Sequence, residues 1–167
     1  TAISLIFSAE KWVHGPLFVC LDMDYLRHEI KQLLPRGVFL MDIKEDPHRR
    51  LVRCFVDAEE SISIDETTEI AKSIQNSGLL DEYYPDGASL EVTTIGLSEP
   101  LEQPFQYRKN VGRMLNLTYD KNGNQKHTEA ELVGFSDGIL YLKNKYKGQF
   151  QLVLENILQA KVIVQFN

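Results

Sequence analysis

Residues 90–112 constrain the fold more than any other part of the sequence, because the pattern of the chain changes there. Leu90–Ile95 alternates like a β-strand and ends at Gly96. Two prolines and an aromatic-basic cluster follow: Pro100, Pro104 and Tyr107-Arg108-Lys109. Helix and strand patterns alternate before this stretch, whereas only strand patterns occur after Gly112. We therefore expect two small domains that meet here.

The predicted boundaries follow this change of pattern. Residues 23–95 form an N-terminal α/β domain, residues 96–109 a linker, and residues 110–167 a C-terminal β domain. Residues 1–22 form an N-terminal extension that is an extra strand, an ordered arm or sequence outside the native protein. Its two apolar runs are far shorter than the roughly 20 residues of a membrane span.

The N-terminal domain is predicted to begin with a helix at about residues 22–34, capped by Asp22 or Asp24 and ended by Pro35 and Gly37. Two strands follow, at about residues 38–44 and 51–57, joined as a hairpin. The first alternates Phe39, Met41 and Ile43, and the second alternates Val52, Cys54 and Val56. Asp57, at the end of the second strand, is either a turn cap or an acceptor at an interface.

A capping box predicts the second helix, because Ser63 is followed three residues later by Glu66. Its buried stripe consists of four residues: Thr67, Ile70, Ala71 and Ile74. Gly78 ends the helix. With the strand Leu90–Ile95, the order is α-β-β-α-β, a small sheet with helices on one face.

The C-terminal domain is predicted to contain five short strands, at about residues 114–119, 130–135, 139–144, 150–154 and 160–166. The turns between them include residues 120–127, 136–138 and 145–148. Strands this short suggest a small barrel with a filled interior. The fold class is therefore α+β.

Charge divides at the same point as the pattern. Residues 1–95 contain 9 lysines and arginines and 17 aspartates and glutamates, net −8, whereas residues 96–167 contain 9 and 7, net +2. An acidic half repels phosphate and suits a basic protein partner, although a solvated acidic surface is the commoner explanation.

No catalytic motif occurs in the sequence. A P-loop, G-x-S-x-G, H-E-x-x-H and G-x-G-x-x-G are all missing, and the four histidines lie in polar contexts without organised partners. The two cysteines, Cys20 and Cys54, are far apart in apolar settings, which indicates buried reduced thiols. We predict no enzymatic activity, no metal and no cofactor; an enzyme with an unrecognised site is the third alternative.

Basic and aromatic residues alternate in the predicted turn at residues 143–147. Lys143, Lys145 and Lys147 suit phosphates, and Tyr146 suits stacking on a base. These four are the predicted RNA contacts. The alternative is a lysine-rich hairpin tip that keeps a sheet edge soluble.

Two segments carry a family signature. Glu91–Leu101 reads EVTTIGLSEPL, and Tyr107–Gly112 reads YRKNVG. Together they resemble the signature of the bacterial ribosome maturation factor RimP family. Weaker blocks at residues 40–43, 53–57, 63–66, 132–134, 154–157 and 160–162 occur in the family's order, so the resemblance covers about residues 23–167.

The resemblance implies an N-terminal α/β domain followed by a Sm-like (SH3-like) barrel. It also implies a cytoplasmic, non-catalytic assembly factor that binds the immature small (30S) ribosomal subunit, through a basic ribosomal protein and in part rRNA. On this reading the chain is a monomer with no membrane or small-molecule partner. The predicted partner-binding residues are Gly96, Leu97, Pro100, Leu101, Tyr107, Arg108, Lys109 and Arg113. The alternative is a stand-alone RNA-binding module.

Three residues depart from the family pattern. Ile95 stands where the family usually has proline, Ser98 where an acidic residue is common, and Glu99 where arginine is common. Glu99 reverses a charge within the signature, so a phosphate contact made by that arginine is not expected here.

Overall fold

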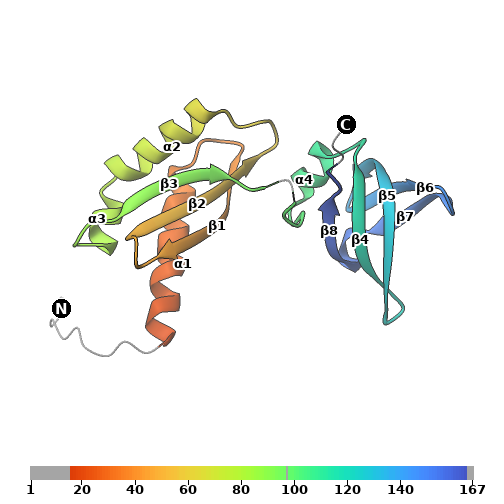
Figure 1. Cartoon of the computed structure of the whole chain (residues 1–167), viewed down its shortest axis with the longest axis horizontal. Helices are drawn as coiled ribbons and strands as arrows, with labels where there is room; N and C mark the ends of the chain where they lie inside the picture. The colour runs from red at the N-terminus through yellow and green to blue at the C-terminus, as the bar shows by residue number, and fades with distance from the viewer. Residues whose placement is uncertain (1–15, 97, 165–167) are drawn as a thin grey trace, which may run out of the picture.

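A computed structural model describes residues 16–96 and 98–164, with side chains from Met23 onward. It contains two sheets that lie side by side, with a short helix between them (Figure 1). The N-terminal part consists of α1 (Pro16–Leu33), β1 (Val38–Asp46), β2 (Leu51–Ala58), α2 (Ile64–Asn76), α3 (Leu79–Tyr83) and β3 (Ser89–Thr94). The C-terminal part consists of α4 (Pro104–Lys109), β4 (Met114–Lys121), β5 (Asn124–Ser136), β6 (Ile139–Asn144), β7 (Gly148–Val153), the 3-10 helix η1 (Leu154–Asn156) and β8 (Ile157–Val162). The chain is thus α+β, as predicted.

The N-terminal sheet has the strand order β1-β2-β3. Strands β1 and β2 form the predicted antiparallel hairpin, and β3 pairs with β2 in parallel. A parallel neighbour requires a crossover, which α2 and α3 supply. Side chains of α1, α2, α3 and the sheet share one core, so these three helices cover the same face of the sheet.

A β-bulge changes the predicted alternation of β1. The register with β2 shifts between Leu40 and Asp42, so Leu40 and Ile43 are buried, whereas Phe39 is 41% exposed. The predicted stripe of Phe39, Met41 and Ile43 is therefore wrong, because one extra residue reverses the side on which the following side chains lie. The alternation of Val52, Cys54 and Val56 in β2 is confirmed, since all three are buried.

The helices differ from the prediction mainly at their starts. Helix α1 begins at Pro16, about six residues earlier than expected, so Asp22 and Asp24 lie inside it and do not cap it. Proline fits the first turn of a helix because the N–H groups there have no intrahelical partner. Helix α3 was not predicted. Residues 1–15 of the predicted extension lie outside the described residues.

The capping box of α2 is confirmed. The Ser63 hydroxyl accepts a hydrogen bond from the backbone N–H of Glu66, and the Glu66 carboxylate accepts one from the backbone N–H of Ser63. The serine bonds lower the pKa of Glu66. Ile70 and Ile74 of the predicted stripe are buried, and Gly78 follows the helix with φ at 75°.

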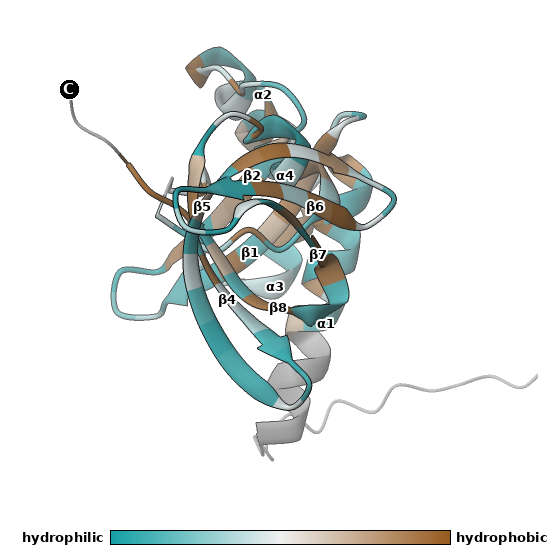
Figure 2. Cartoon of the chain, turned by 90° about the vertical axis from the view of Figure 1, so that its right-hand side faces the viewer, coloured by the Kyte–Doolittle hydropathy of each residue, from teal (hydrophilic) through white to brown (hydrophobic). Residues whose placement is uncertain are grey.

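The C-terminal sheet has the order β7-β6-β5-β4-β8. Its β4–β5 hairpin continues through residues 120–127, where a long polar turn was expected. The reason is a two-residue turn at Asn122 and Gly123, whose φ values of 56° and 77° match the twist of the strands. The hairpin is largely hydrophilic toward its tip (Figure 2).

The predicted closed barrel is not found in the described part of the chain. No ladder there joins β7 to β8, which form the two edges of the sheet. Strand β8 spans Ile157–Val162, earlier than the predicted residues 160–166, of which 165 and 166 lie outside the described residues. The sheet nevertheless encloses its own core, built around Leu115, Leu117, Leu132, Leu140 and Leu142. Two separate cores therefore stabilise the two sheets.

Cys54 lies fully buried in the N-terminal core. Burial raises the pKa of its thiol from 9.0 to about 11, and the charge of Arg27 opposes this in part. No helix among the described residues is long and apolar enough to cross a membrane.

We expect Cys54 to resist alkylation in the folded protein. In a Cys20→Ser background at pH 8, its reaction with iodoacetamide should be at least about 100-fold slower than in guanidinium chloride, because the raised pKa alone lowers the thiolate fraction that much. Mass spectrometry of quenched time points measures both rates. Comparable rates in the two conditions would show that this core opens readily.

Candidate functional site

The predicted partner-binding segment, Gly96–Arg113, lies between the two sheets (Figure 1). It was expected to be a linker, yet residues 104–109 form α4. Pro104 occupies the first turn, and the Gln106 side-chain carbonyl accepts hydrogen bonds from the backbone N–H groups of Glu102 and Gln103, at 2.8 and 2.9 Å. The segment is therefore an ordered joint with its own internal hydrogen bonds.

Tyr107 attaches α4 to the C-terminal sheet. Its side chain is 1% exposed, its ring stacks on Phe135 with 5.4 Å between centroids, and its hydroxyl donates to the Leu101 carbonyl at 3.1 Å. Burial raises the pKa of this phenol to about 12. Tyr107 thus belongs to the core of the C-terminal sheet.

Asp57, at the end of β2, forms hydrogen bonds with side chains on the opposite side of α4. Its carboxylate accepts from Gln106 Nε2 at 2.9 Å and from Lys109 Nζ at 2.8 Å. It also accepts from the backbone N–H of Ala58, the last residue of β2, at 2.9 Å, so of the two predicted roles it fills that of interface acceptor. Gln106 is 1% exposed, and the side chains of Lys109 and Asp57 are 30% and 11% exposed. Hydrogen bonds to a charged group this well covered contribute more than exposed ones.

An aromatic pair and a second ion pair extend this contact. Phe105 stacks on Phe39 with 4.4 Å between ring centroids, and Arg108 pairs with Glu59 at 2.9 Å. The Arg108–Glu59 pair is more than half exposed, so it contributes little to stability. We call the contact of Phe105, Gln106, Arg108 and Lys109 with Phe39, Asp57 and Glu59 the α4 interface.

The remaining predicted residues of the segment lie along the C-terminal sheet or at its surface. Pro100 forms a bridge with Lys161, and the Leu101 N–H donates to the Ala160 carbonyl at 2.8 Å, so both continue the edge of β8. Gly96 and Arg113 are exposed, and Arg113 has no side-chain partner among the described residues. Leu97 lies outside the described residues.

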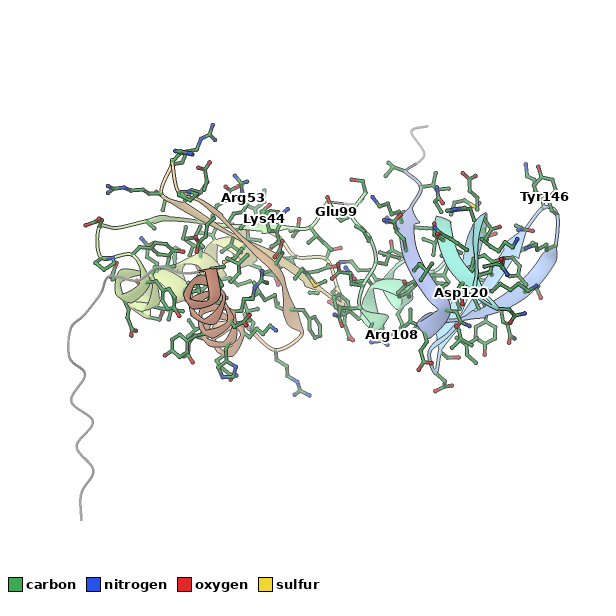
Figure 3. All side chains as sticks on the ribbon, turned by 90° about the horizontal axis from the view of Figure 1, so that it is seen from below. Lys44, Arg53, Glu99, Arg108, Asp120 and Tyr146 are labelled. Atoms are coloured by element: carbon green, nitrogen blue, oxygen red, sulfur yellow. The ribbon has the colours of Figure 1, made fainter. Side chains whose placement is uncertain are left out.

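Two hollows flank this segment. One, of about 290 Å³, is lined by Glu99, Lys109 and Arg113 among others. The other, of about 350 Å³, lies between the segment and the face of the N-terminal sheet opposite α1, α2 and α3, near Met41 and Phe55. Glu99 lines both hollows and lies at the waist between the sheets (Figure 3).

One departure from the family pattern has a structural consequence. The Ile95 N–H donates to the Val56 carbonyl at 3.3 Å, which extends the pairing of β3 with β2 by one bond. Proline has no N–H and cannot form this bond. Ser98 and Glu99 are both exposed, so their differences from the family pattern affect the surface.

The predicted RNA contacts lie elsewhere. Lys143, Lys145, Tyr146 and Lys147 are exposed at the β6–β7 turn, and Tyr146 lies at the end of the molecule away from the N-terminal sheet (Figure 3). The fold does not bring them to the Gly96–Arg113 segment. Within residues 23–96 and 98–164, no group of three or more His, Cys, Asp or Glu is arranged to hold a metal ion.

Sequence reasoning missed most of the α4 interface. Asp57 was considered as an interface acceptor, but Phe39 was assigned to the buried stripe of its strand, and Phe105 and Gln106 were given no role. The clearest available signal was an acid at a strand end, Asp57, and an amide and an ammonium group, Gln106 and Lys109, located 49 and 52 residues later. Only the fold shows that these groups are neighbours.

No family model matches the sequence. A ribosome maturation factor RimP from Christiangramia forsetii is 33% identical over 139 residues, which cover 75% of this chain and 84% of that protein. The chain belongs to the RimP family.

Tyr107 provides a test of its structural role. We expect Tyr107→Ala to lower the free energy of unfolding by about 3–5 kcal/mol, because it leaves a cavity in the C-terminal core. Tyr107→Phe should cost only about 1 kcal/mol, the loss of one hydrogen bond. Urea denaturation measures both. Equal, small effects would place the ring outside the core.

The α4 interface should fix the orientation of the two sheets. Amide residual dipolar couplings from both sheets of the wild type should fit one alignment tensor. Asp57→Ala leaves the Gln106 amide and Lys109 ammonium without their shared acceptor, at about 1–3 kcal/mol, so the two sheets should then require different tensors. Glu69→Ala, which breaks only an exposed ion pair with Lys72, is the control. A single tensor in Asp57→Ala would contradict the role assigned to this carboxylate.

Proposed function

We propose that this protein is a non-catalytic assembly factor that binds the immature small ribosomal subunit and promotes its maturation. The observation that carries the proposal is family membership: the relative from Christiangramia forsetii is named a ribosome maturation factor. The proposal includes action in the cytoplasm as a monomer. Its partners are a basic ribosomal protein and, in part, rRNA.

The charge distribution supports this choice of partners. Residues 1–95 carry a net charge of −8 and residues 96–167 a net charge of +2. An acidic surface attracts a basic protein and speeds its association, whereas it repels a phosphate backbone. The N-terminal part is therefore assigned to the ribosomal protein, and contact with rRNA to the C-terminal part.

The proposed domains are residues 23–95 and 110–167, the second with the Sm-like arrangement that the family resemblance implies. Residues 96–109 join them, and the hydrogen bonds of the α4 interface support a fixed joint over a flexible linker. A preformed arrangement of two sheets loses little conformational entropy on binding. Such a protein can act by binding one conformation of the subunit and raising its population.

The proposed binding surface is the exposed part of the Gly96–Arg113 segment. Tyr107, Gln106 and Lys109 have partners within the protein, so their substitution would disturb the fold as well as binding. The side chain of Lys109 is 30% exposed and pairs with Asp57, whereas Arg108 and Arg113 are exposed cations outside that pair. They are the side chains best placed to contact a partner without supporting either core.

Co-sedimentation with immature small subunits at moderate salt tests the proposal. The wild type should sediment with the subunits, and an Arg108→Ala/Arg113→Ala variant should bind about tenfold more weakly, as expected for loss of a residue worth more than 1 kcal/mol at an interface. Lys31→Ala, in the last turn of α1, is the matched control.

The two failures are distinct. A folded wild type that stays in the supernatant would refute the assembly role. Normal binding by the double variant would retain that role and move the binding surface away from this segment.

A further inference from the structure

The fold brings two distant lysine-containing turns to one end of the C-terminal sheet. Strands β4, β5, β6 and β7 are consecutive antiparallel neighbours, so the β4–β5 and β6–β7 turns lie at the same end. Two side-chain contacts connect them: Asn144 Nδ2 donates to Thr128 Oγ1 at 3.2 Å, and Lys147 Nζ donates to the Tyr119 hydroxyl at 3.5 Å.

Five lysines gather there, and all are exposed: Lys121, Lys126, Lys143, Lys145 and Lys147. We call them, with Tyr146, the lysine end. None of the five forms an ion pair among the residues that the structure describes. Asp120, a nearby carboxylate, accepts from the Gly123 N–H of its own turn at 3.2 Å. Glu131 is the cross-strand neighbour of Lys143 but forms no ion pair with it, so the lysines outnumber the acids that lie beside them.

A hollow of about 480 Å³ lies between the end of β4 and strand β7. Lys121 and Lys147 line it, together with one acidic residue, Asp120, and with Asn122, Gln151 and Asn156 among others. Lys147 lies 5.5 Å from the centroid of Phe150, which holds its ammonium group beside the hollow. The hollow thus combines cations with amide groups that can donate and accept hydrogen bonds.

Protection of a sheet edge explains only some of these lysines. Lys121 and Lys126 lie on the end of the β4–β5 hairpin, which pairs with neither β8 nor β6, so edge protection applies to them. It does not apply to Lys143, which lies on β6 with a neighbour on each side, and the edge strand β7, Gly148–Val153, contains no lysine. Edge protection also gives no reason for Tyr146, whose side chain is 95% exposed.

We propose that the lysine end binds single-stranded RNA. The lysines contact successive phosphates, Tyr146 stacks on a base, and the hollow receives part of an adjacent nucleotide. The inference deepens the proposed function, because it names the surface through which this protein contacts rRNA. Figure 3 places Tyr146 at the end far from the acidic N-terminal sheet, whose repulsion salt screens within about 8 Å under physiological conditions.

Fluorescence anisotropy with a labelled, unstructured 16-nucleotide single-stranded RNA tests this surface in the full-length protein. Three to four phosphate contacts predict a slope of about −2 to −3 for log K against log salt. Lys121→Gln/Lys147→Gln should reduce the magnitude of the slope by about 1.4, and Tyr146→Ala should weaken binding about tenfold with little change of slope. Lys31→Gln/Lys72→Gln, on α1 and α2, is the control of equal charge change.

Each other outcome overturns the inference. Wild-type protein that does not bind this RNA, or variants that bind like the control, would show that the lysine end is not an RNA surface. Equal competition by polyglutamate would show a general polyanion surface. In any of these cases, continued co-sedimentation with immature subunits would leave the proposed function intact.

Discussion

The Asp57 carboxylate at the end of β2 is the acceptor on which the arrangement of the two sheets depends. It accepts from Gln106 and Lys109, and the same Gln106 side chain caps α4 through its carbonyl oxygen. A buried amide without partners costs about 1–3 kcal/mol, so Gln106 favours states in which both ends of its amide are bonded. Formation of α4 and docking of the two sheets therefore stabilise each other. The C-terminal core holds α4 through Tyr107, but it does not by itself orient the two sheets.

Because of this coupling, the short helix α4 contacts both sheets. Successive residues of a helix are rotated by about 100°. Tyr107 consequently faces the C-terminal core, while Gln106 and Lys109 face the N-terminal sheet. A cluster that reads as an exposed aromatic-basic patch thus becomes a structural joint, and only Arg108 keeps a largely exposed charge. In the proposed function, contact of this segment with a partner therefore depends on Arg108 and Arg113.

The elements that sequence could predict are those determined by neighbouring residues. The capping box of α2 and the β1–β2 hairpin depend on contacts a few residues apart, and the periodicity of β2 follows from its own side chains. The bulge in β1 was missed because an extra residue in one strand is defined only against its partner. Helix α4 was missed because two prolines in a short segment indicate a linker as well as a helix start. The bond between Asp57 and Gln106 joins residues 49 positions apart, and no local pattern encodes it.

A fixed joint keeps the acidic and basic parts of the molecule apart. The acidic N-terminal sheet and the lysine end lie at opposite sides of the α4 interface, and a flexible linker would let them approach and neutralise each other. With the sheets held, each surface keeps its own sign of charge available for a partner. Two sites at a fixed spacing also raise the effective concentration of the second contact once the first is made, provided the target presents both at that spacing. Because Asp57 holds the two sheets in one orientation, the spacing of protein and RNA on the target would determine binding as well as their charges.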